Sequence, residues 1–414
     1  MAVYKHLIAL LALFSMITTA LAANNDIPTD LVNQYSIFLN SGIASSEIDT
    51  HLAWVEDLHK NSPGFKQGLA GVTSRFDIGD THGYNGEFDE STARQINDRP
   101  EVSFVLQDDL AEINAIIKQE SAPWGLAALS SREPGASSYK YDDRAGEGFF
   151  AYIVEAGSFE TELEEFGGRL SQAANFTIIL PHESQHGTAV AGLIGSNTYG
   201  AAKKAQMLGV TVGSTANGMM QGLLWSIEDI KDKKRSGRAV INLSMSINDR
   251  TYFDGNTRAN LFKKIWDDAW NQGILIFNSA GNEGLEVSKD ERTLPSVISG
   301  PHITVGSLSE NWDKASHSNF GPFVDIYAPG HNITYLTKDG VSFQEGTSFA
   351  CPLVAGMALT LLANMDPLPK AEDTARILAT QILDLATEHK VGAIPGAGPD
   401  EFQRVAYNGG LDPR

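Results

Sequence analysis

A serine lies at the start of a long apolar run near the carboxyl end of the 414-residue chain. Ser348 stands among small residues in the segment 346–356, and the apolar positions that follow it predict a helix. Free backbone N–H groups at a helix N-terminus stabilise negative charge, and such charge develops when a hydroxyl attacks a carbonyl group. The segment therefore indicates a nucleophile, although an ordinary Thr/Ser helix cap explains these residues alone equally well.

Three other segments carry polar groups that such a serine could use. His186 begins a small-residue helical pattern, Asn282 stands on a glycine-rich loop after a buried strand, and Glu155 ends a strand-like run. Each has an ordinary interpretation by itself, as a core or capping histidine, a common turn and a solvated acid. Together, in the order acid, histidine, amide and serine, they supply the parts of an acyl-transfer site.

The elements that must position these residues alternate between strand and helix. Strand-like runs occupy residues 149–154, 207–212, 239–243, 274–277, 303–305 and 324–327, and helical patterns occupy 188–195, 222–231, 257–271, 348–364 and 370–387. Several of the strands are almost wholly apolar, as in a parallel sheet that is covered on both faces. We therefore predict an α/β fold with a doubly wound, largely parallel sheet and an active site at the carboxyl ends of its strands.

A smaller pattern precedes this one, from residue 26 to about residue 109. Strands at 34–39, 72–78 and 102–106, a short strand after a turn at 83–88, a helix capped by Ser46 and a helix at 90–96 give the order β-α-β-β-α-β. This order predicts a small α+β domain of the ferredoxin-like kind, which could be a binding module or an appended chaperone. Residues 112–121 are predicted to be a linker.

Composition and the amino terminus limit the possible partners and the compartment. A formal net charge of -20 and the absence of a basic run make nucleic acid an unlikely partner and disfavour anionic membrane surfaces. Residues 1–22 carry Lys5, a short apolar run and Ala-Leu-Ala, which predicts a cleaved signal peptide and a secreted, extracellular protein. The alternative, a membrane anchor, requires a longer apolar stretch.

Cysteine and asparagine positions add two expectations for an exported chain. Cys351 is the only cysteine, so no internal disulfide can form, and we expect it to be a buried, inert thiol. Asn175 and Asn332 begin glycosylation sequons, whereas Asn242 begins a third that falls in a strand and is expected to be buried.

With these residues in view, the chain from about residue 26 to its end resembles the subtilisin superfamily, and within it the secreted fungal proteinase K group. Further landmarks of the resemblance are residues 86–90, 121–126, 141–143, 146–148, 165–169, 199–200, 202–204 and 406–409. The resemblance implies a signal peptide over residues 1–22, an inhibitory propeptide over 23–116 and a catalytic domain over 117–414. It implies that the propeptide helps the catalytic domain to fold, occupies its cleft and is removed near Ile116 or Ile117.

The resemblance also implies roles for single residues. Ser348 matches the nucleophile, His186 the general base and Asn282 the side-chain oxyanion donor of a serine endopeptidase. The substrate-binding walls correspond to Gly218, Ser244, Met245, Ser246, Ala280 and Gly281. No catalytic cofactor is implied, but a structural calcium ion could be held by the carbonyls of Pro301 and Ile303 and the carboxylate of Asp325, where a plain turn is the alternative. A monomer acting on protein or peptide substrates is expected.

The departures from the family pattern lie at positions that correspond to catalytic and substrate-binding residues of the family. Glu155 and Ala156 stand where the family has aspartate and a hydroxyl residue, Gln185 precedes the base, and Ser246 and Ile247 replace paired glycines on the cleft wall. Glutamate keeps the negative charge of aspartate but is longer by one methylene group. At such a position, displacing a catalytic group by about 1 Å can change the reaction rate a hundredfold. The sequence therefore leaves two functions open: a protease, slow or of narrow specificity, or an inactive homologue that binds peptides, inhibitors or another protein.

Overall fold

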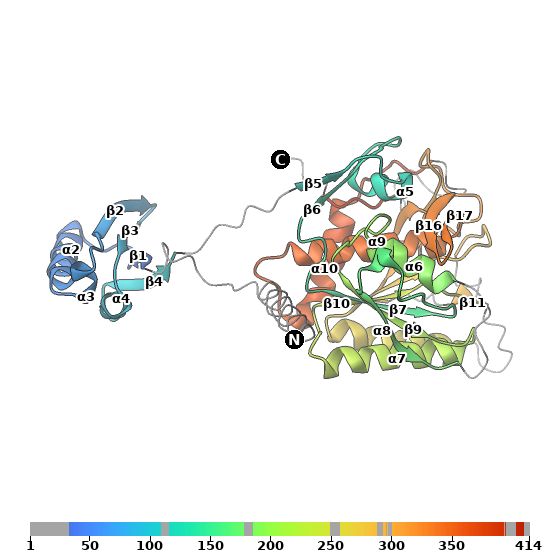
Figure 1. The fold of residues 1–414 in the computed structure, drawn as a ribbon, viewed down its shortest axis with the longest axis horizontal. Helices are drawn as coiled ribbons and strands as arrows, with labels where there is room; N and C mark the ends of the chain where they lie inside the picture. The colour runs from blue at the N-terminus through green and yellow to red at the C-terminus, as the bar shows by residue number, and fades with distance from the viewer. Residues whose placement is uncertain are drawn as a thin grey trace, which may run out of the picture. The chain divides into compact units, whose positions relative to one another are not determined.

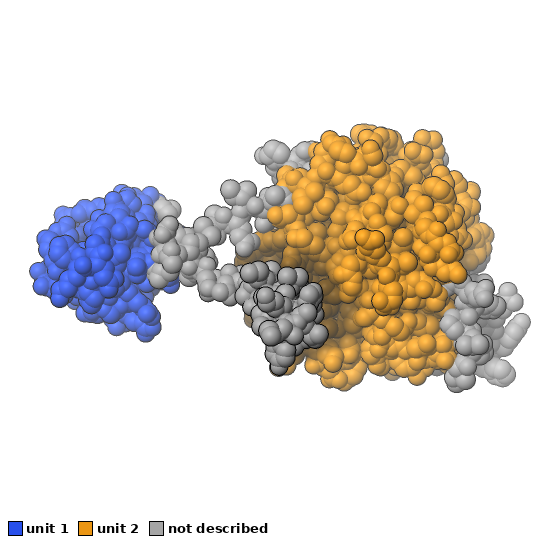
Figure 2. All heavy atoms as spheres, viewed as in Figure 1, with its two compact units in different colours: residues 1–113 blue, residues 114–414 orange. Residues whose placement is uncertain are grey.

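The computed structural model describes residues 33–108, 116–177, 185–248, 257–287, 293–294, 296, 300–392, 394 and 403–409. The predicted signal peptide at 1–22 lies outside these residues. The chain divides into two compact units, Met1–Ile113 and Asn114–Arg414 (Figure 2). Among the described residues, no helix is both long enough and apolar enough to cross a membrane.

The first unit is an antiparallel sheet with helices, as the sequence predicts (Figure 1). Its strands are β1 (Gln34–Leu39), β2 (Gly71–Ile78), β3 (Thr81–Glu87) and β4 (Val102–Gln107), in the order β2-β3-β1-β4. Its helices are α2 (Ser45–Lys60), α3 (Pro63–Lys66) and α4 (Glu90–Asn97). Alternate residues of β1, including Ile37, point into the core of this unit, where they pack with Leu52 and Val55 of α2. The predicted β-α-β-β-α-β order is confirmed.

Two details of the first unit differ from the prediction. Ala44, not Ser46, is the N-cap of α2, and the carboxylate of Glu47 accepts a hydrogen bond of 3.1 Å from the Ala44 N–H. Gly83 lies inside β3 and not in a turn, because the ring of Phe76 crosses the strand where a Cβ would stand. Glycine therefore marks close packing here, which a sequence pattern cannot distinguish from a turn.

The second unit contains a seven-stranded sheet in which all paired strands are parallel. The strand order is β15-β14-β12-β10-β7-β9-β8. The strands are β7 (Phe150–Glu155), β8 (Leu170–Asn175), β9 (Gln206–Thr211), β10 (Ala239–Leu243), β12 (Leu275–Ser279), β14 (Ile303–Leu308) and β15 (Ile326–Pro329). The doubly wound α/β prediction is confirmed.

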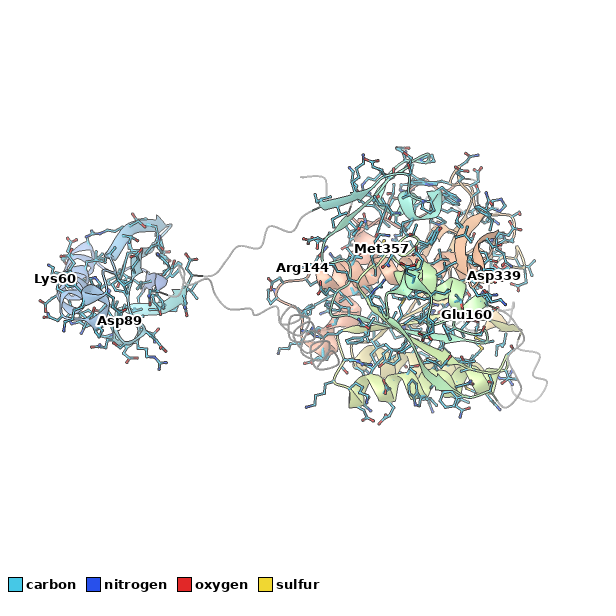
Figure 3. All side chains as sticks on the ribbon, in the orientation of Figure 1. Lys60, Asp89, Arg144, Glu160, Asp339 and Met357 are labelled. Atoms are coloured by element: carbon cyan, nitrogen blue, oxygen red, sulfur yellow. The ribbon has the colours of Figure 1, made fainter. Side chains whose placement is uncertain are left out.

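Helices cover both faces of this sheet (Figure 1). On one face lie α6 (His186–Gly195), α9 (Thr347–Ala363) and α10 (Ala371–Leu385), and on the other lie α7 (Ala216–Asp232) and α8 (Thr257–Asn271). Helix α9 is buried along most of its length, and Figure 3 shows its residue Met357 inside the unit. Ala151 and Ile153 of β7 face the α6/α9 layer, whereas Tyr152 and Val154 face the α7/α8 layer. Because successive side chains of a strand point to opposite faces of the sheet, each of these residues packs against one helical layer only.

Smaller elements complete the second unit. They include β5 (Ile116–Gln119), which pairs with β6 (Tyr139–Asp142), β11 (Ile247–Asn248) with β13 (Thr293–Leu294), and the hairpin of β16 (Ile333–Thr337) and β17 (Gly340–Gln344). The short helix α5 (Trp124–Ala127) and the 3-10 turn Ala128–Ser130 lie between β5 and β6, and the 3-10 turn Glu164–Phe166 lies between β7 and β8. Residues 116–119, which we predicted as linker, are thus a strand. Edge strand β8 was not predicted, because its sequence is polar and half of it is exposed.

Candidate active site

Glu155 and His186 meet at the carboxyl end of β7. Glu155 is the last residue of β7 and continues the series Ala151 and Ile153, which faces the layer that contains α6. His186 is the first residue of α6, and its Nδ1 lies 3.0 Å from Oε2 of Glu155. Only 4% of the Glu155 side chain is exposed, against 27% for His186. The charge of Glu155 raises the pKa of His186 above its usual value, and this effect outweighs the opposing effect of burial.

Backbone contacts hold the two partners of this pair. Glu155 remains paired with Thr211 of β9, and its other oxygen, Oε1, accepts a 2.8 Å hydrogen bond from the Ala156 N–H. The start of α6 is attached to the loop after β7, because the carbonyl of Ser158 accepts a 3.0 Å hydrogen bond from the Thr188 N–H. Gly187 permits this approach, since a Cβ there would stand 2.7 Å from the same carbonyl oxygen. The extra methylene of glutamate is thus accommodated without breaking the strand ladder.

Ser348 lies in the first turn of α9, which packs against α6 and against β10, β12 and β14. Gly346, just before the helix, has φ 154°, a region that favours glycine. The Ser348 hydroxyl is half-buried and donates a 3.2 Å hydrogen bond to the carbonyl of Ser244. The next residue, Phe349, sets the edge of its ring against that of His186, with centroids 5.7 Å apart.

Thr347 joins the loop of Asn282 to the start of α9. Its N–H and its hydroxyl donate to Oδ1 of Asn282 at 2.8 and 3.0 Å, and its hydroxyl oxygen accepts from the Gly281 N–H at 3.1 Å. Asn282 is exposed, so its Nδ2 group keeps donors available to a ligand. Asn319 supports the loop through hydrogen bonds to the Ala280 carbonyl and from the Leu285 N–H. Thr347 and Asn319 were not among the predicted site residues, because their role depends on contacts between distant segments.

The remaining predicted site residues surround the same edge of the sheet. Ser244, Met245 and Ser246 follow β10, with Ser244 buried and Ser246 exposed, and Ala280 and Gly281 follow β12. Gly218 lies in the first turn of α7, where its N–H donates to the Thr215 hydroxyl at 3.0 Å. These are positions where an extended substrate could contact parallel-strand ends. The loop at residues 249–256 lies outside the described residues.

Gln185, next to the base, contacts the β16–β17 hairpin. Its side-chain oxygen accepts a 2.6 Å hydrogen bond from the N–H of Lys338 in the turn of that hairpin. Figure 3 labels the next residue of this turn, Asp339. The bulky residue that replaces glycine before the histidine therefore has a structural partner.

The expectations for cysteine and for the sequons can be checked directly. Cys351 is free and buried in α9, its thiol donates to Oδ1 of Asn242 at 3.2 Å, and burial raises its pKa. The thiol is buried, as predicted. Asn242 is fully buried, whereas Asn175 and Asn332 are exposed.

The predicted calcium ligands lie together at the start of β14. Pro301 and Ile303 flank the buried His302, and Asp325 accepts a 2.7 Å hydrogen bond from the Thr304 N–H. Burial raises the pKa of Asp325 to about 6, against the effects of that N–H and of the charge of Arg404. A carboxylate that is desolvated in this way fits a hard cation, because the ion would compensate for the lost hydration.

Comparisons with known proteins agree with this geometry. The sequence profile of the subtilase family matches residues 160–398, which is more than half of the chain. The chain belongs to the subtilase family. The profile of peptidase inhibitor I9 matches residues 34–114 of this subtilase, nearly all of which belong to the first unit. The family match contains His186, Asn282 and Ser348 but begins five residues after Glu155.

Individual relatives match this subtilase over most of its length. It is 33% identical over 391 residues to alkaline protease 1 of Emericella nidulans, covering 91% of each chain. It is 33% identical to alkaline proteinase of Hapsidospora chrysogena, covering 97% and 98%, and 35% identical to subtilisin-like protease 2 of Trichophyton equinum, covering 92% and 90%. A crystal structure of a cold-adapted subtilisin-like serine proteinase aligns with a TM-score of 0.59 and 28% identity, over 70% of this chain and 99% of that one. The chain is thus a subtilase-family serine protease with a propeptide domain.

Proposed function

We propose that this subtilase is an active serine endopeptidase in which Glu155, His186 and Ser348 form the catalytic triad. The 3.0 Å contact between Glu155 Oε2 and His186 Nδ1 carries the proposal, because it is what orients a general base. The acid thereby fixes the tautomer in which Nε2 is free to take the proton of Ser348. Glutamate performs this part in other hydrolase triads.

The remaining steps follow from the groups around Ser348. Its Oγ attacks the peptide carbonyl while His186 removes the proton, which it later delivers to the leaving amine. The oxyanion forms beside the Asn282 Nδ2 group and the first N–H groups of α9. Thr347 holds the oxygen end of the Asn282 amide, so that the donor end needs little reorganisation.

Substrate would bind as an extended peptide along the ends of β10, β12 and α7. In this proposal Ser244, Met245 and Ser246 form one wall and part of the first specificity pocket, Gly218 forms the other wall, and Ala280 with Gly281 also contacts the substrate. The exposed Ser246 and the half-buried Ile247 would narrow the cleft and restrict the peptides that enter.

The maturation of the chain follows from its division into units. We propose that residues 1–22 direct export, that residues 23–116 form an inhibitor acting within the same chain and that residues 117–414 form the catalytic domain. The match to peptidase inhibitor I9 supports the inhibitory role. Ile116 and Ile117, where removal is expected, are 51% and 38% exposed and begin the short strand β5, so this segment would have to leave β6 to be cut.

A structural calcium ion at Pro301, Ile303 and Asp325 belongs to the same proposal. The two backbone carbonyls and one carboxylate would hold the ion, which would stabilise the start of β14 and take no part in the reaction. The desolvated carboxylate of Asp325 supports the site.

Labelling with a serine-directed fluorophosphonate tests the activity. Purified wild-type chain should label once per molecule and lose its propeptide, whereas Ser348→Ala should do neither. Ser214→Ala, a change of an exposed serine before α7, is the matched control and should behave like wild type. A folded wild type that does not label would contradict the enzyme proposal.

The second candidate function is a binding protein that uses the same cleft without catalysis. It is favoured by one contact, since the Ser348 hydroxyl donates to the Ser244 carbonyl and must turn away from it before reacting. A wild-type chain that does not label but retains a peptide aldehyde or a protein inhibitor would support this candidate.

A further inference from the structure

Three side chains with metal-binding groups converge in the second unit, close to the catalytic segments but outside the proposed triad. They are His317, in the loop after β14, His331, after β15, and Glu345, after β17. One ligand atom from each lies within 4.8 Å of the others. Nδ1 of His331 is in direct contact with Oε2 of Glu345, and Nδ1 of His317 lies 3.7 Å from the same oxygen. The two imidazole rings are nearly parallel, at an interplanar angle of 21°.

The inner histidine is held in the manner of a metal ligand. Nε2 of His317 is 3.1 Å from the Ser307 hydroxyl, and the Ser307 N–H donates in turn to the Ser318 hydroxyl at 2.9 Å. Metal-binding histidines usually use their second ring nitrogen for such a contact, which fixes the ring. Gly330 makes room for this arrangement, because a Cβ there would overlap the Ser307 hydroxyl.

The other nitrogen of His317 lacks a hydrogen bond. Its Nδ1 is buried and has no hydrogen-bond partner among the described residues, although it points toward Glu345. A buried polar atom without a partner destabilises a folded protein and is rare in native structures, so this nitrogen indicates a missing ligand.

We propose that His317, His331 and Glu345 bind a zinc-class divalent transition metal, with water in the fourth position. Two imidazoles and one carboxylate are a set that zinc accepts, whereas calcium prefers oxygen ligands alone. Ligand atoms at tetrahedral zinc are about 3.4 Å apart for bonds of about 2.0–2.1 Å. The more distant ligand atoms must therefore approach by no more than about 1.4 Å, whereas His331 and Glu345, now in direct contact, must move apart. His331 and Glu345 can make this adjustment, since their side chains are 46% and 50% exposed.

Such an ion would connect the segments that position the catalytic groups. The carbonyl of Gly330, next to His331, accepts a 2.8 Å hydrogen bond from the N–H of Gly346, which directly precedes α9. The carbonyl of His317 accepts at 2.8 Å from the N–H of Gly284, in the loop of Asn282. The metal would thus cross-link the approach to the nucleophile and the support of the amide loop, in a chain whose one cysteine cannot form a disulfide.

Calorimetric titration of the full-length chain with zinc chloride tests the site. The chain carries Ser348→Ala so that self-digestion cannot interfere, and it is first freed of metal by dialysis against a chelator. We expect one tight ion per molecule and a rise of about 5 °C in the melting temperature of the second unit at zinc one hundred times the dissociation constant. His331→Ala and Glu345→Gln should each weaken binding at least tenfold, and both positions are exposed enough for the variants to fold.

Two control variants locate the ion. His82→Ala removes a histidine that pairs with Asp77 in the first unit, and it should leave zinc binding unchanged. His186→Ala should also leave binding unchanged, because the proposed site does not use the triad. Cobalt in place of zinc should give the visible absorption of a tetrahedral nitrogen and oxygen site, and Glu345→Gln should alter this spectrum. Loss of binding in His186→Ala, binding that survives both ligand variants, or no binding at all would overturn the proposal.

Discussion

The carboxylate of Glu155 lies 3.0 Å from Nδ1 of His186 and is held from behind by the N–H of Ala156. Oε1 of the longer acid accepts a hydrogen bond from the backbone, whereas Oε2 lies at ion-pair distance from the ring. The approach is possible because the alternation of β7 places Glu155 on the α6 side, and because the Ser158 carbonyl fixes the start of that helix. These contacts determine how the proposed triad should respond to substitution.

Shortening the acid should reduce activity. Glu155→Asp withdraws the carboxylate by about 1.5 Å from a ring that it now contacts, and a displacement of that size can lower the rate about a hundredfold. Glu155→Gln keeps the length but removes the charge, and it should lower kcat by about a thousandfold or more. Steady-state hydrolysis of a chromogenic peptide measures both. A large rise with Glu155→Asp would show instead that glutamate is the defect in a weakened enzyme.

The pH profile should report the pKa of His186. Because Glu155 raises this pKa, the acidic limb of kcat/KM should lie above about 6.5, the ordinary value for histidine. The same shift affects folding. The Glu155–His186 pair contributes fully to the stability of the folded state at pH values below the ordinary pKa, and this contribution is lost as pH rises through the raised pKa. In Glu155→Gln only burial remains, so the limb should move to lower pH. Rate profiles from about pH 5 to 9 test this, and a limb that does not move would argue against the pairing.

Thr347→Val should impair both stability and catalysis. The substitution keeps the shape of the side chain but leaves the buried Gly281 N–H without its acceptor and releases one contact to Asn282. We expect a loss of about 1–3 kcal/mol in unfolding free energy and about a tenfold loss in kcat.

Thr360→Val is the matched control for that variant. This threonine is also buried in α9, and its hydroxyl donates to the Met357 carbonyl at 2.7 Å, away from the site. It should affect stability alone. Denaturant melts combined with turnover measurements distinguish the two variants, and equal turnover in both would contradict the role given to Thr347.

Calcium should reverse the effect of the substitution Asp325→Asn on the stability of the folded protein. The raised pKa of about 6 means that, without a cation, stability falls as pH rises from about 4 through 6, because the unfolded chain ionises first. At pH 8 without calcium, Asp325→Asn should therefore stabilise the protein, by at most about 3 kcal/mol. With millimolar calcium it should destabilise. Thermal melts with chelator or calcium give both signs, and the same sign in both media would exclude a calcium ion at this carboxylate.

The sequence predicts best where apolar runs and caps act locally. Ala239–Leu243 and Thr257–Asn271 have the bounds that the patterns predicted, because one is almost wholly apolar and the other keeps helical spacing throughout. The polar edge strand Leu170–Asn175 was missed, because it is held in the sheet by backbone pairing with β9 and its side chains show no strand pattern. Fold class and family were therefore accessible from the sequence, and edge elements were not.

The candidate site shows the same limit. The segments of Glu155, His186, Asn282 and Ser348 could be named from motifs, and the structure places the first two in contact, while their catalytic roles stay predictions. Glu155 was predicted to lie at the end of its strand, but its pairing with Thr211 in the ladder could not be read from the sequence. The contacts of Thr347 and Asn319, and the convergence of His317 with Glu345, join segments that only the tertiary fold brings together.

The lone thiol of Cys351, enclosed between α9 and β10, has a practical consequence. A reductant such as dithiothreitol has no disulfide to reduce in this chain, because the sequence contains a single cysteine. Mixed with protein fibres that are held together by cystine, the same reductant would loosen the fibre and leave the subtilase intact, so that digestion and reduction could proceed in a single vessel.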